Sequence, residues 1–230
     1  MAEEREDGDV ARDLPDAART PGEEAPATRR RLTRRDAAVV ERQLGRPPRG
    51  ACRVAHRCPC GLPDVVETAP RLPGGEPFPT LFYLTCPRAA SAIGTLEGSG
   101  MMRAMQARLA EDADLAARYR AAHEDYIARR DKAAAEAGLS PLPRGMQSAG
   151  GMPSRVKCLH ALVAHELAVP GINPFGREAL DALPEWWAAG PCVDVTTLEG
   201  LDDLPGEESA GTAADGADAG KRHGNGEAAR

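Results

Sequence analysis

The sequence is poor in aromatic residues, which form only 3% of its 230 positions. It also has no stretch approaching the ~20 consecutive apolar residues that a membrane-spanning helix needs. Apolar residues still make up 42% of the chain, so a core is possible but must be built mainly from alanine, leucine and valine. An excess of basic charge is missing too, because the formal net charge is −6. This balance argues against a general nucleic-acid binder or a protein that binds anionic membranes.

The first residues, MAEEREDGD, lack the basic and then apolar order of a secretory signal peptide. We therefore expect a cytoplasmic protein whose six cysteines are kept reduced. In a reducing compartment, clustered cysteines serve metal or redox chemistry more often than a disulfide framework.

Composition divides the chain into three parts. Residues 1–32 are acidic and contain few large apolar side chains, and residues 198–230 are rich in glycine, alanine and acidic residues. Such segments bury too little surface to offset their chain entropy, so we predict two disordered tails. The part between them, 33–197, is predicted to form a single domain.

Within that domain, short β-prone runs come before helical patterns. The strands are predicted at 53–57, 65–68 and 80–85, and the helices begin near residues 33, 87, 101, 112, 153 and 177. The last two helices are predicted to span 153–168 and 177–188. Strands followed by helices indicate an α+β fold, with a small antiparallel three-stranded sheet that carries a cysteine knuckle and packs on a layer of about five helices.

The segment Cys58-Pro59-Cys60 is the strongest chemical signal. Side chains two apart on an extended segment face the same way, so both sulfurs can reach one ion. Cys86 ends the third predicted strand and can return to this knuckle. Cys158 is the predicted fourth ligand, and His160 is its alternative. Four thiolates would suit structural zinc or an iron–sulfur cluster, whereas a histidine in the set would favour zinc.

Two other interpretations of the cysteines remain open. They can be ordinary buried thiols, which is the reading we assign to Cys52 and Cys192. Alternatively, Cys58 and Cys60 can form a redox pair. His165 follows Cys158 by seven residues, or ~10 Å along a helix, so these two are not expected to share a metal.

A glycine-rich loop before the predicted helix at 153 is a candidate anion site. Gly150, Gly151, Ser154, Arg155 and Lys157 would offer backbone N–H groups and positive charge to a small phosphorylated ligand. The spacing is not that of a Walker sequence, and a flexible loop with a helix cap is the simpler alternative. No GxSxG, HExxH or dinucleotide-binding motif is present.

The blocks HRCPCGLP, PFPTLFYLTCPR, SAIGTLEGSGMM and GGMPSRVKCLHALVAHEL occur in this order. In these blocks the chain resembles an uncharacterised, mainly actinobacterial family called domain of unknown function 501, over about residues 36–192. The resemblance implies no established activity. It implies gene neighbours that include a septum-formation initiator and an exopolyphosphatase, and hence a protein partner in the division or envelope machinery.

Two functions follow as hypotheses. The first is a binding or adaptor module stabilised by zinc or an iron–sulfur cluster. The second is a small enzyme that uses the cysteine site for redox chemistry or holds a phosphorylated ligand at the loop from Gly150 to Lys157.

Overall fold

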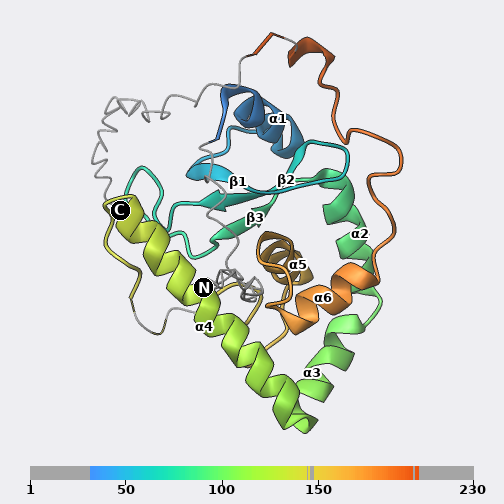
Figure 1. Cartoon of the computed structure of the whole chain (residues 1–230). Coiled ribbons are helices and arrows are strands. Elements are labelled where there is room, and N and C mark those ends of the chain that lie inside the picture. Colours follow the sequence, from blue (N-terminus) through green and yellow to red (C-terminus); the bar gives the residue numbers. More distant parts are fainter. Residues whose placement is uncertain (1–31, 144, 146–147, 199, 202–230) are drawn as a thin grey trace, which may run out of the picture.

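The computed structural model describes residues 32–143, 145, 148–198 and 200–201. Residues 1–31 and 202–230, which hold nearly all of the two predicted tails, lie outside the described residues. The elements follow in this order: α1 (Arg34–Leu44), β1 (Ala51–Arg57), β2 (Pro63–Thr68), β3 (Phe82–Leu84), α2 (Pro87–Gly98), α3 (Met101–Glu111), α4 (Ala113–Glu136), α5 (Leu159–Ala168), α6 (Pro174–Asp181) and a short 3₁₀ helix, η1 (Thr196–Leu198). The predicted α+β fold is confirmed (Figure 1).

The three strands form one antiparallel sheet in the order β1-β2-β3. The middle strand, β2, is buried along its whole length. Val65 pairs with Leu84 and belongs to the main core, whereas its neighbour Val66 packs with α1 on the other face. Because successive side chains of β2 point to opposite faces, the sheet has two apolar faces, and other elements must pack against each of them.

Helix α1 covers the face that carries Val66. Thr33 caps it by accepting a hydrogen bond from the Asp36 N–H at 3.0 Å, and Gly45 ends it in the left-handed conformation. Asp36 also accepts both arms of the Arg57 guanidinium, at 2.7 and 2.9 Å, which ties α1 to the end of β1.

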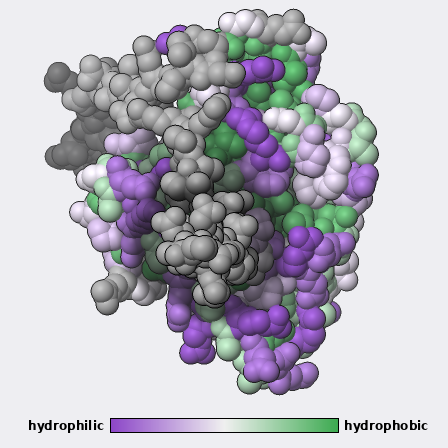
Figure 2. Space-filling view, viewed as in Figure 1, coloured by the Kyte–Doolittle hydropathy of each residue, from purple (hydrophilic) through white to green (hydrophobic). Residues whose placement is uncertain are grey.

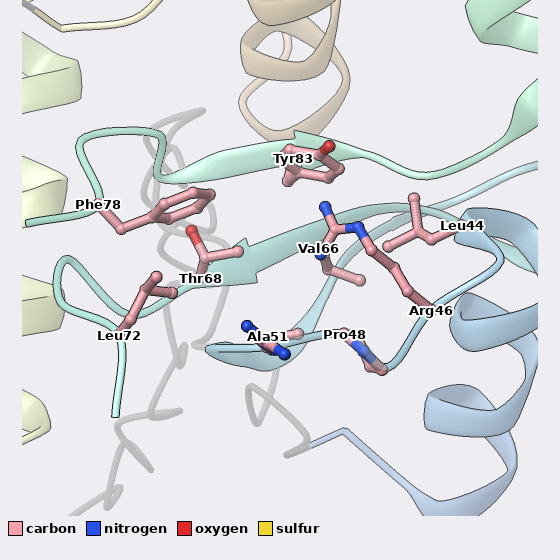
Figure 3. Close-up of a pocket in the computed structure, with 10 residues that line it drawn as sticks. Leu44, Arg46, Pro48, Ala51, Val66, Thr68, Leu72, Phe78 and Tyr83 are labelled. Carbon is pink, nitrogen blue, oxygen red and sulfur yellow. The ribbon is translucent and has the colours of Figure 1, made fainter. Parts of the chain in front are cut away.

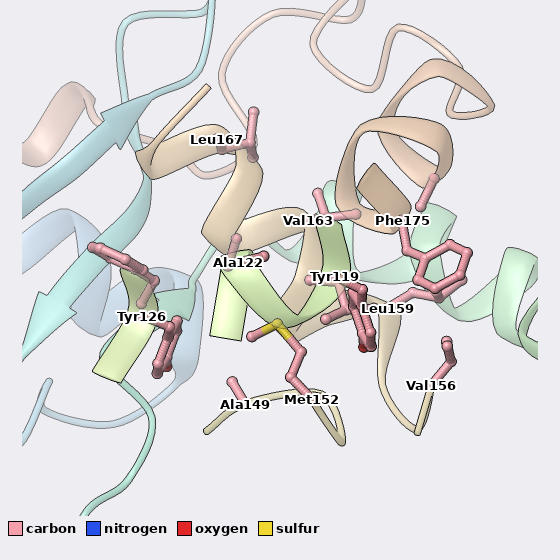
Figure 4. Packing of buried hydrophobic residues seen from close by; sticks show 14 of the residues in the cluster. Tyr119, Ala122, Tyr126, Ala149, Met152, Val156, Leu159, Val163, Leu167 and Phe175 are labelled. Carbon is pink, nitrogen blue, oxygen red and sulfur yellow. The ribbon is translucent and has the colours of Figure 1, made fainter. Parts of the chain in front are cut away.

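Helix α5 lies at the centre of the molecule, between the sheet and helices α2, α4 and α6 (Figure 1). Seven of its ten residues are buried, which is typical of a helix surrounded by other elements. Tyr119 and Tyr126 of α4 and Phe175 of α6 pack around it (Figure 4). The Tyr126 hydroxyl accepts a hydrogen bond from the Leu81 N–H at 2.5 Å, so α4 is also joined to the chain that enters β3.

Helix α5 begins at Leu159, six residues later than predicted. Residues 151–157 instead form turns that place the glycine-rich loop against α5. A Cβ atom at Gly150 would lie 2.6 Å from Leu162 Cδ2, so the loop can approach the helix only because this residue is glycine. Cys158 precedes the helix in an extended conformation.

Helix α6 begins three residues earlier than predicted and ends seven residues earlier. The Asn173 side chain caps it by accepting the Gly176 N–H at 2.9 Å, and Pro174 occupies its first turn. The helix ends at Asp181, before Pro184, so Trp186 and Trp187 follow it instead of lying on it.

The segment after α6 returns to the sheet end of the molecule. Figure 1 shows it running from α6 past α2 to η1 beside α1. Arg88 of α2 donates a hydrogen bond to the Gly190 carbonyl at 2.8 Å, and Arg42 of α1 donates to the Asp194 carbonyl at 2.5 Å. This path carries Cys192 back to the beginning of α2.

Hydrophilic residues cover the lower end of the face in Figure 2, where α3 and α4 meet in Figure 1. Within the described part of the chain, no helix is both long enough and apolar enough to cross a membrane.

Candidate metal centres

The cysteine knuckle is a tight turn between β1 and β2. The Gly61 N–H donates to the Cys58 carbonyl at 2.8 Å, and the Cys58 N–H donates to the Leu62 carbonyl at 3.0 Å. The Cys58 sulfur forms a side-chain hydrogen bond with Cys60 and accepts the Cys60 backbone N–H. The turn brings the two thiols together, in place of the extended segment from which their convergence was predicted.

A second pair of thiols forms between residues that are far apart in sequence. Cys86 precedes α2 as its N-cap residue, and its sulfur makes no capping hydrogen bond, although the nearby backbone N–H groups of Ala89 and Arg88 act to lower the pKa of the thiol. The same sulfur forms a side-chain hydrogen bond with Cys192. Cys192 also accepts a hydrogen bond from Gln43 Nε2 at 3.3 Å.

The two pairs belong to one apolar cluster. Cys58 and Cys86 are buried in it beside Trp186, with exposed fractions of 4% and 1% for the cysteines. Cys60 and Cys192 pack against the same cluster and also against the neighbouring one formed with α1. Cys158, the predicted fourth ligand, is not in this cluster, and Cys192 occupies the place predicted for it. We call Cys58, Cys60, Cys86 and Cys192 the thiol cluster.

The two pairs do not merge into one tight group. Among the described residues, no three of these sulfurs all lie within 4.8 Å of one another. A single tetrahedral zinc ion with Zn–S bonds of about 2.3 Å needs sulfur separations of about 3.8 Å, so it would draw the pairs together. A [2Fe–2S] cluster takes two thiolates on each iron, so its two pairs need not touch.

Burial and hydrogen bonding shift the pKa values of Cys58, Cys86 and Cys192 in different directions. Burial raises the pKa of Cys58 to about 12. The hydrogen bond with Cys192 raises the pKa of Cys86, and the same bond, with help from Gln43, lowers the pKa of Cys192 to about 6. The Cys86–Cys192 pair therefore loses its first proton easily and its second with difficulty.

Cys158 and His160 lie instead with Glu97, at the end of α2. Among the described residues this is the one set of three Cys, His, Asp or Glu side chains whose ligand atoms all lie within 4.8 Å of one another. On the predicted helix, which begins at Pro153, residues two apart such as Cys158 and His160 would point to nearly opposite sides. Because the helix begins after Cys158, the extended backbone at that residue lets the two side chains converge.

The hydrogen bonds around His160 are specific. Its Nδ1 lies 3.1 Å from Glu97 Oε1, and its Nε2 lies 3.0 Å from the Ala90 carbonyl oxygen. The Leu159 N–H donates to the same Glu97 oxygen at 2.6 Å. The hydrogen bond with Cys158, and then Glu97, raise the pKa of His160 to about 9 in the metal-free protein, although partial burial acts in the opposite direction.

Two backbone N–H groups of the glycine-rich loop, which is the predicted anion site, donate to carbonyl groups of the same loop. The Lys157 N–H donates to the Gly150 carbonyl at 2.7 Å, and the Arg155 N–H donates to the Gly151 carbonyl at 3.0 Å. The first N–H of α5 is bound by Glu97, a carboxylate of this chain. Ser154, Arg155 and Lys157 are exposed. The phosphate site stays a prediction, without support from these groups.

Two histidines have structural partners. His56 Nδ1 lies 2.7 Å from Asp64 Oδ1, and His165 is buried in the core, stacked on Phe82. His165 also lies 3.5 Å from Asp125 Oδ2. The expectation that His165 does not share a ligand site with Cys158 agrees with this position.

An apolar cavity of about 160 Å³ lies on the sheet face that carries Val66 and Tyr83 (Figure 3). It is smaller than the roughly 300–1,000 Å³ typical of sites for drug-sized ligands. Among the described residues that line it there is no cysteine, histidine, aspartate or glutamate. The cavity therefore offers no acid–base or metal chemistry.

The fold and the sites define a small α+β domain whose cysteines gather in pairs at the end of a three-stranded sheet. The chain belongs to the family described as "Protein of unknown function (DUF501)", which matches residues 54–181. The matched range lies inside the 36–192 stretch of the predicted resemblance. No curated protein and no solved structure matches the chain.

Proposed function

We propose that the protein is a metal-stabilised binding module whose metal centre, zinc or a [2Fe–2S] cluster, is held by Cys58, Cys60, Cys86 and Cys192. The observation that carries the proposal is that four cysteines from three distant segments lie in or against one apolar cluster, as two pairs. Cys192 replaces Cys158 in the ligand set predicted from the sequence.

Hydrogen bonds to the sulfurs support a thiolate centre. Cys192 accepts the Gln43 amide at 3.3 Å, and backbone N–H groups beside Cys58 and Cys86 act to lower the pKa of those thiols. Neutral buried thiols do not need such donors, whereas four thiolates around a cation leave negative charge that N–H groups stabilise. The positive charge of Arg88 also acts on Cys192.

An unpaired donor lies in the same cluster. In the described part of the chain, the buried Trp186 Nε1–H has no hydrogen-bond acceptor. Buried polar groups are usually paired, so this donor is consistent with an additional acceptor beside the sulfurs. The sulfide of an iron–sulfur cluster or a metal-bound thiolate would supply one.

The centre would have a structural role. It would join the β1–β2 turn, the beginning of α2 and the segment after α6. Metal binding in such sites contributes directly to folding. The partner of the module remains the one implied by the resemblance, a protein of the division or envelope machinery in the cytoplasm, and no described contact bears on it.

The test is metal analysis of the full chain purified without oxygen. We expect stoichiometric zinc, or iron with visible absorption, in the natural protein and in Cys52→Ser. We expect Cys192→Ser to lose that metal. Cys52 is a suitable control because its thiol contacts the Gly50 carbonyl on β1 and lies outside the thiol cluster. Folded, metal-free natural protein, or a Cys192→Ser variant with the same metal content as the natural protein, would contradict the proposal.

One observation favours a second candidate, a dithiol redox protein. The hydrogen bond between the Cys86 and Cys192 thiols lowers the pKa of Cys192, which favours its thiolate form. Oxidation would join the two sulfurs, release two protons and transfer two electrons to a partner disulfide, which becomes two thiols. Mass spectrometry of protein alkylated before and after reduction distinguishes the candidates, because a metal centre predicts four protected thiols and no disulfide.

A further inference from the structure

We propose that Glu97, Cys158 and His160 form a second metal site, separate from the thiol cluster, which binds a zinc-class divalent cation and leaves one coordination position open. The inference does not depend on the proposed function, because the two sites share no residue.

The donor set fits zinc. A carboxylate oxygen, a sulfur and an imidazole nitrogen lie within 4.8 Å of one another and come from two elements that pack together, α2 and α5. Zinc accepts all three donor types, and sites with three protein ligands and a water are typical of catalytic zinc. With Glu97 and Cys158 ionised and His160 neutral, a divalent cation makes the site electrically neutral.

The orientation of His160 favours a cation at this point. Its Nε2 faces the Ala90 carbonyl, which can only accept a hydrogen bond, so this nitrogen carries a proton. The lone pair of Nδ1 in the neutral ring then points at the Glu97 carboxylate, another acceptor. A positive charge is needed between them, either a second proton on the ring or a metal. The Nε2–H to carbonyl bond is also the usual way in which metal-binding histidines are oriented.

The same geometry argues against a thiol–imidazole–carboxylate relay. In such a relay the carboxylate binds one ring nitrogen and the thiol uses the other. Here Glu97 occupies Nδ1, and Nε2 is taken by a backbone carbonyl. Both ring nitrogens therefore already face an oxygen acceptor, which a relay does not allow, whereas the three ligand atoms lie close enough together to bind one ion.

Solvent can reach the site. The side chains of His160 and Glu97 are 32% and 24% exposed, and Cys158 is half-buried. The thiol cluster differs, because Cys58 and Cys86 are almost completely buried. An accessible site with three ligands can accept water or a further ligand at its fourth position.

The test is Co²⁺ binding to the full chain, with the metal of the thiol cluster left in place. We expect the natural protein to take up one further equivalent of Co²⁺ and to show a thiolate charge-transfer band. Cys158→Ser should lose this band. Glu97→Gln keeps an acceptor for the Leu159 N–H but removes the charge, and we expect it to weaken Co²⁺ binding at least tenfold, since even residues behind the ligands contribute about 10–100-fold.

Glu124→Gln, an exposed change on α4, is the matched control and should bind Co²⁺ normally. Cys192→Ser separates the two proposals: it should lose the metal of the thiol cluster and keep the Cys158 charge-transfer band. Equal Co²⁺ uptake by the natural protein and Cys158→Ser would overturn the second site. So would a natural protein that binds no further Co²⁺ while iodoacetamide rapidly modifies Cys158, because the group would then be a reactive thiol.

Discussion

The region around α5 and the thiol cluster are stabilised in different ways. Around α5, Tyr119, Tyr126 and Phe175 pack with aliphatic side chains from every neighbouring element. The thiol cluster has one large buried side chain, Trp186, among its buried members, and the rest are cysteines and Ala89. The first region contains many large, fully buried side chains, whereas the large side chains that pack against the second, Leu84, Leu180, Leu183 and Trp187, are only partly buried. We infer that metal binding stabilises the thiol cluster in the way that apolar packing stabilises the region around α5. The following predictions test this difference.

Loss of the metal should have the largest effect. Structural zinc binds with about 10–16 kcal/mol in small zinc domains, so its removal exceeds any single core substitution. We expect Cys86→Ser, or a strong chelator, to unfold the segment after α6 and the β1–β2 turn while α5 stays protected. Hydrogen exchange followed by mass spectrometry measures this pattern. Uniform loss of protection, or no loss, would show that the two regions do not differ as described.

Truncation of the aromatic core should come next. Phe175 is fully buried, and its ring packs edge-on against Tyr119 with centroids 4.9 Å apart. We expect Phe175→Ala to lower the free energy of unfolding by about 3–5 kcal/mol without changing the metal content. Urea unfolding combined with metal analysis measures both. Phe78→Ala is the control, since Phe78 is only half-buried and should cost less. If Phe175→Ala also lost metal, the region around α5 and the thiol cluster would depend on each other, which would contradict the contrast between them.

The close crossing of α5 and α6 gives a smaller effect. A Cβ atom at Gly176 would clash with the Leu162 carbonyl of α5, so we expect Gly176→Ala to destabilise the protein by about 1–3 kcal/mol. Gly94 on α2 is the matched control, because a Cβ there meets nothing within 4 Å. Gly94→Ala should stabilise the protein by about 0.5–1 kcal/mol through its helix propensity. Thermal unfolding of both variants measures these effects. If Gly176→Ala and Gly94→Ala shifted the unfolding temperature in the same direction, the close packing at Gly176 would be contradicted.

The smallest effect concerns acid stability. The hydrogen bond with His165, and then Arg129, lower the pKa of Asp125 to about 2 from an ordinary value of 3.8. The native state therefore favours the ionised carboxylate, and this stabilisation is present above pH 4 and is lost as the pH falls through about 2. Asp125→Asn should flatten the pH dependence of stability between pH 4 and 2. Glu124→Gln, on the same helix, should retain more of this pH dependence than Asp125→Asn. Identical stability profiles for the two variants would show that Asp125 makes no special contribution.

Local signals in the sequence predicted most of the fold. Thr33 and Gly45 bound α1, and Pro87 begins α2, because caps and proline act within one turn of the chain. The end of α6 was missed because Trp186 and Trp187 continue the apolar pattern, although Pro184 ends the helix before them. The beginning of α5 was missed because Pro153 imitates a helix start, while tertiary contacts place the start after Cys158.

The sites were only partly predictable. The spacing of Cys58 and Cys60 was sufficient to bring them together, and Cys86 was correctly expected at the end of a strand near them. Cys192 was not found, because it reaches Cys86 through the path of a segment without regular structure. Glu97 was missed for the same reason: its meeting with His160 depends on how α2 packs against α5, which no local pattern reports.

The most direct test of the central claim is X-ray absorption spectroscopy at the metal edge, on full-length protein purified without oxygen. In a Cys158→Ser/Glu97→Gln variant, whose second site is disabled, the account predicts a sulfur-only first shell with four protein thiolates, which is reduced by one sulfur or lost when Cys192→Ser is added. A shell that contains nitrogen or oxygen in that variant, or one that Cys192→Ser leaves unchanged, would contradict it.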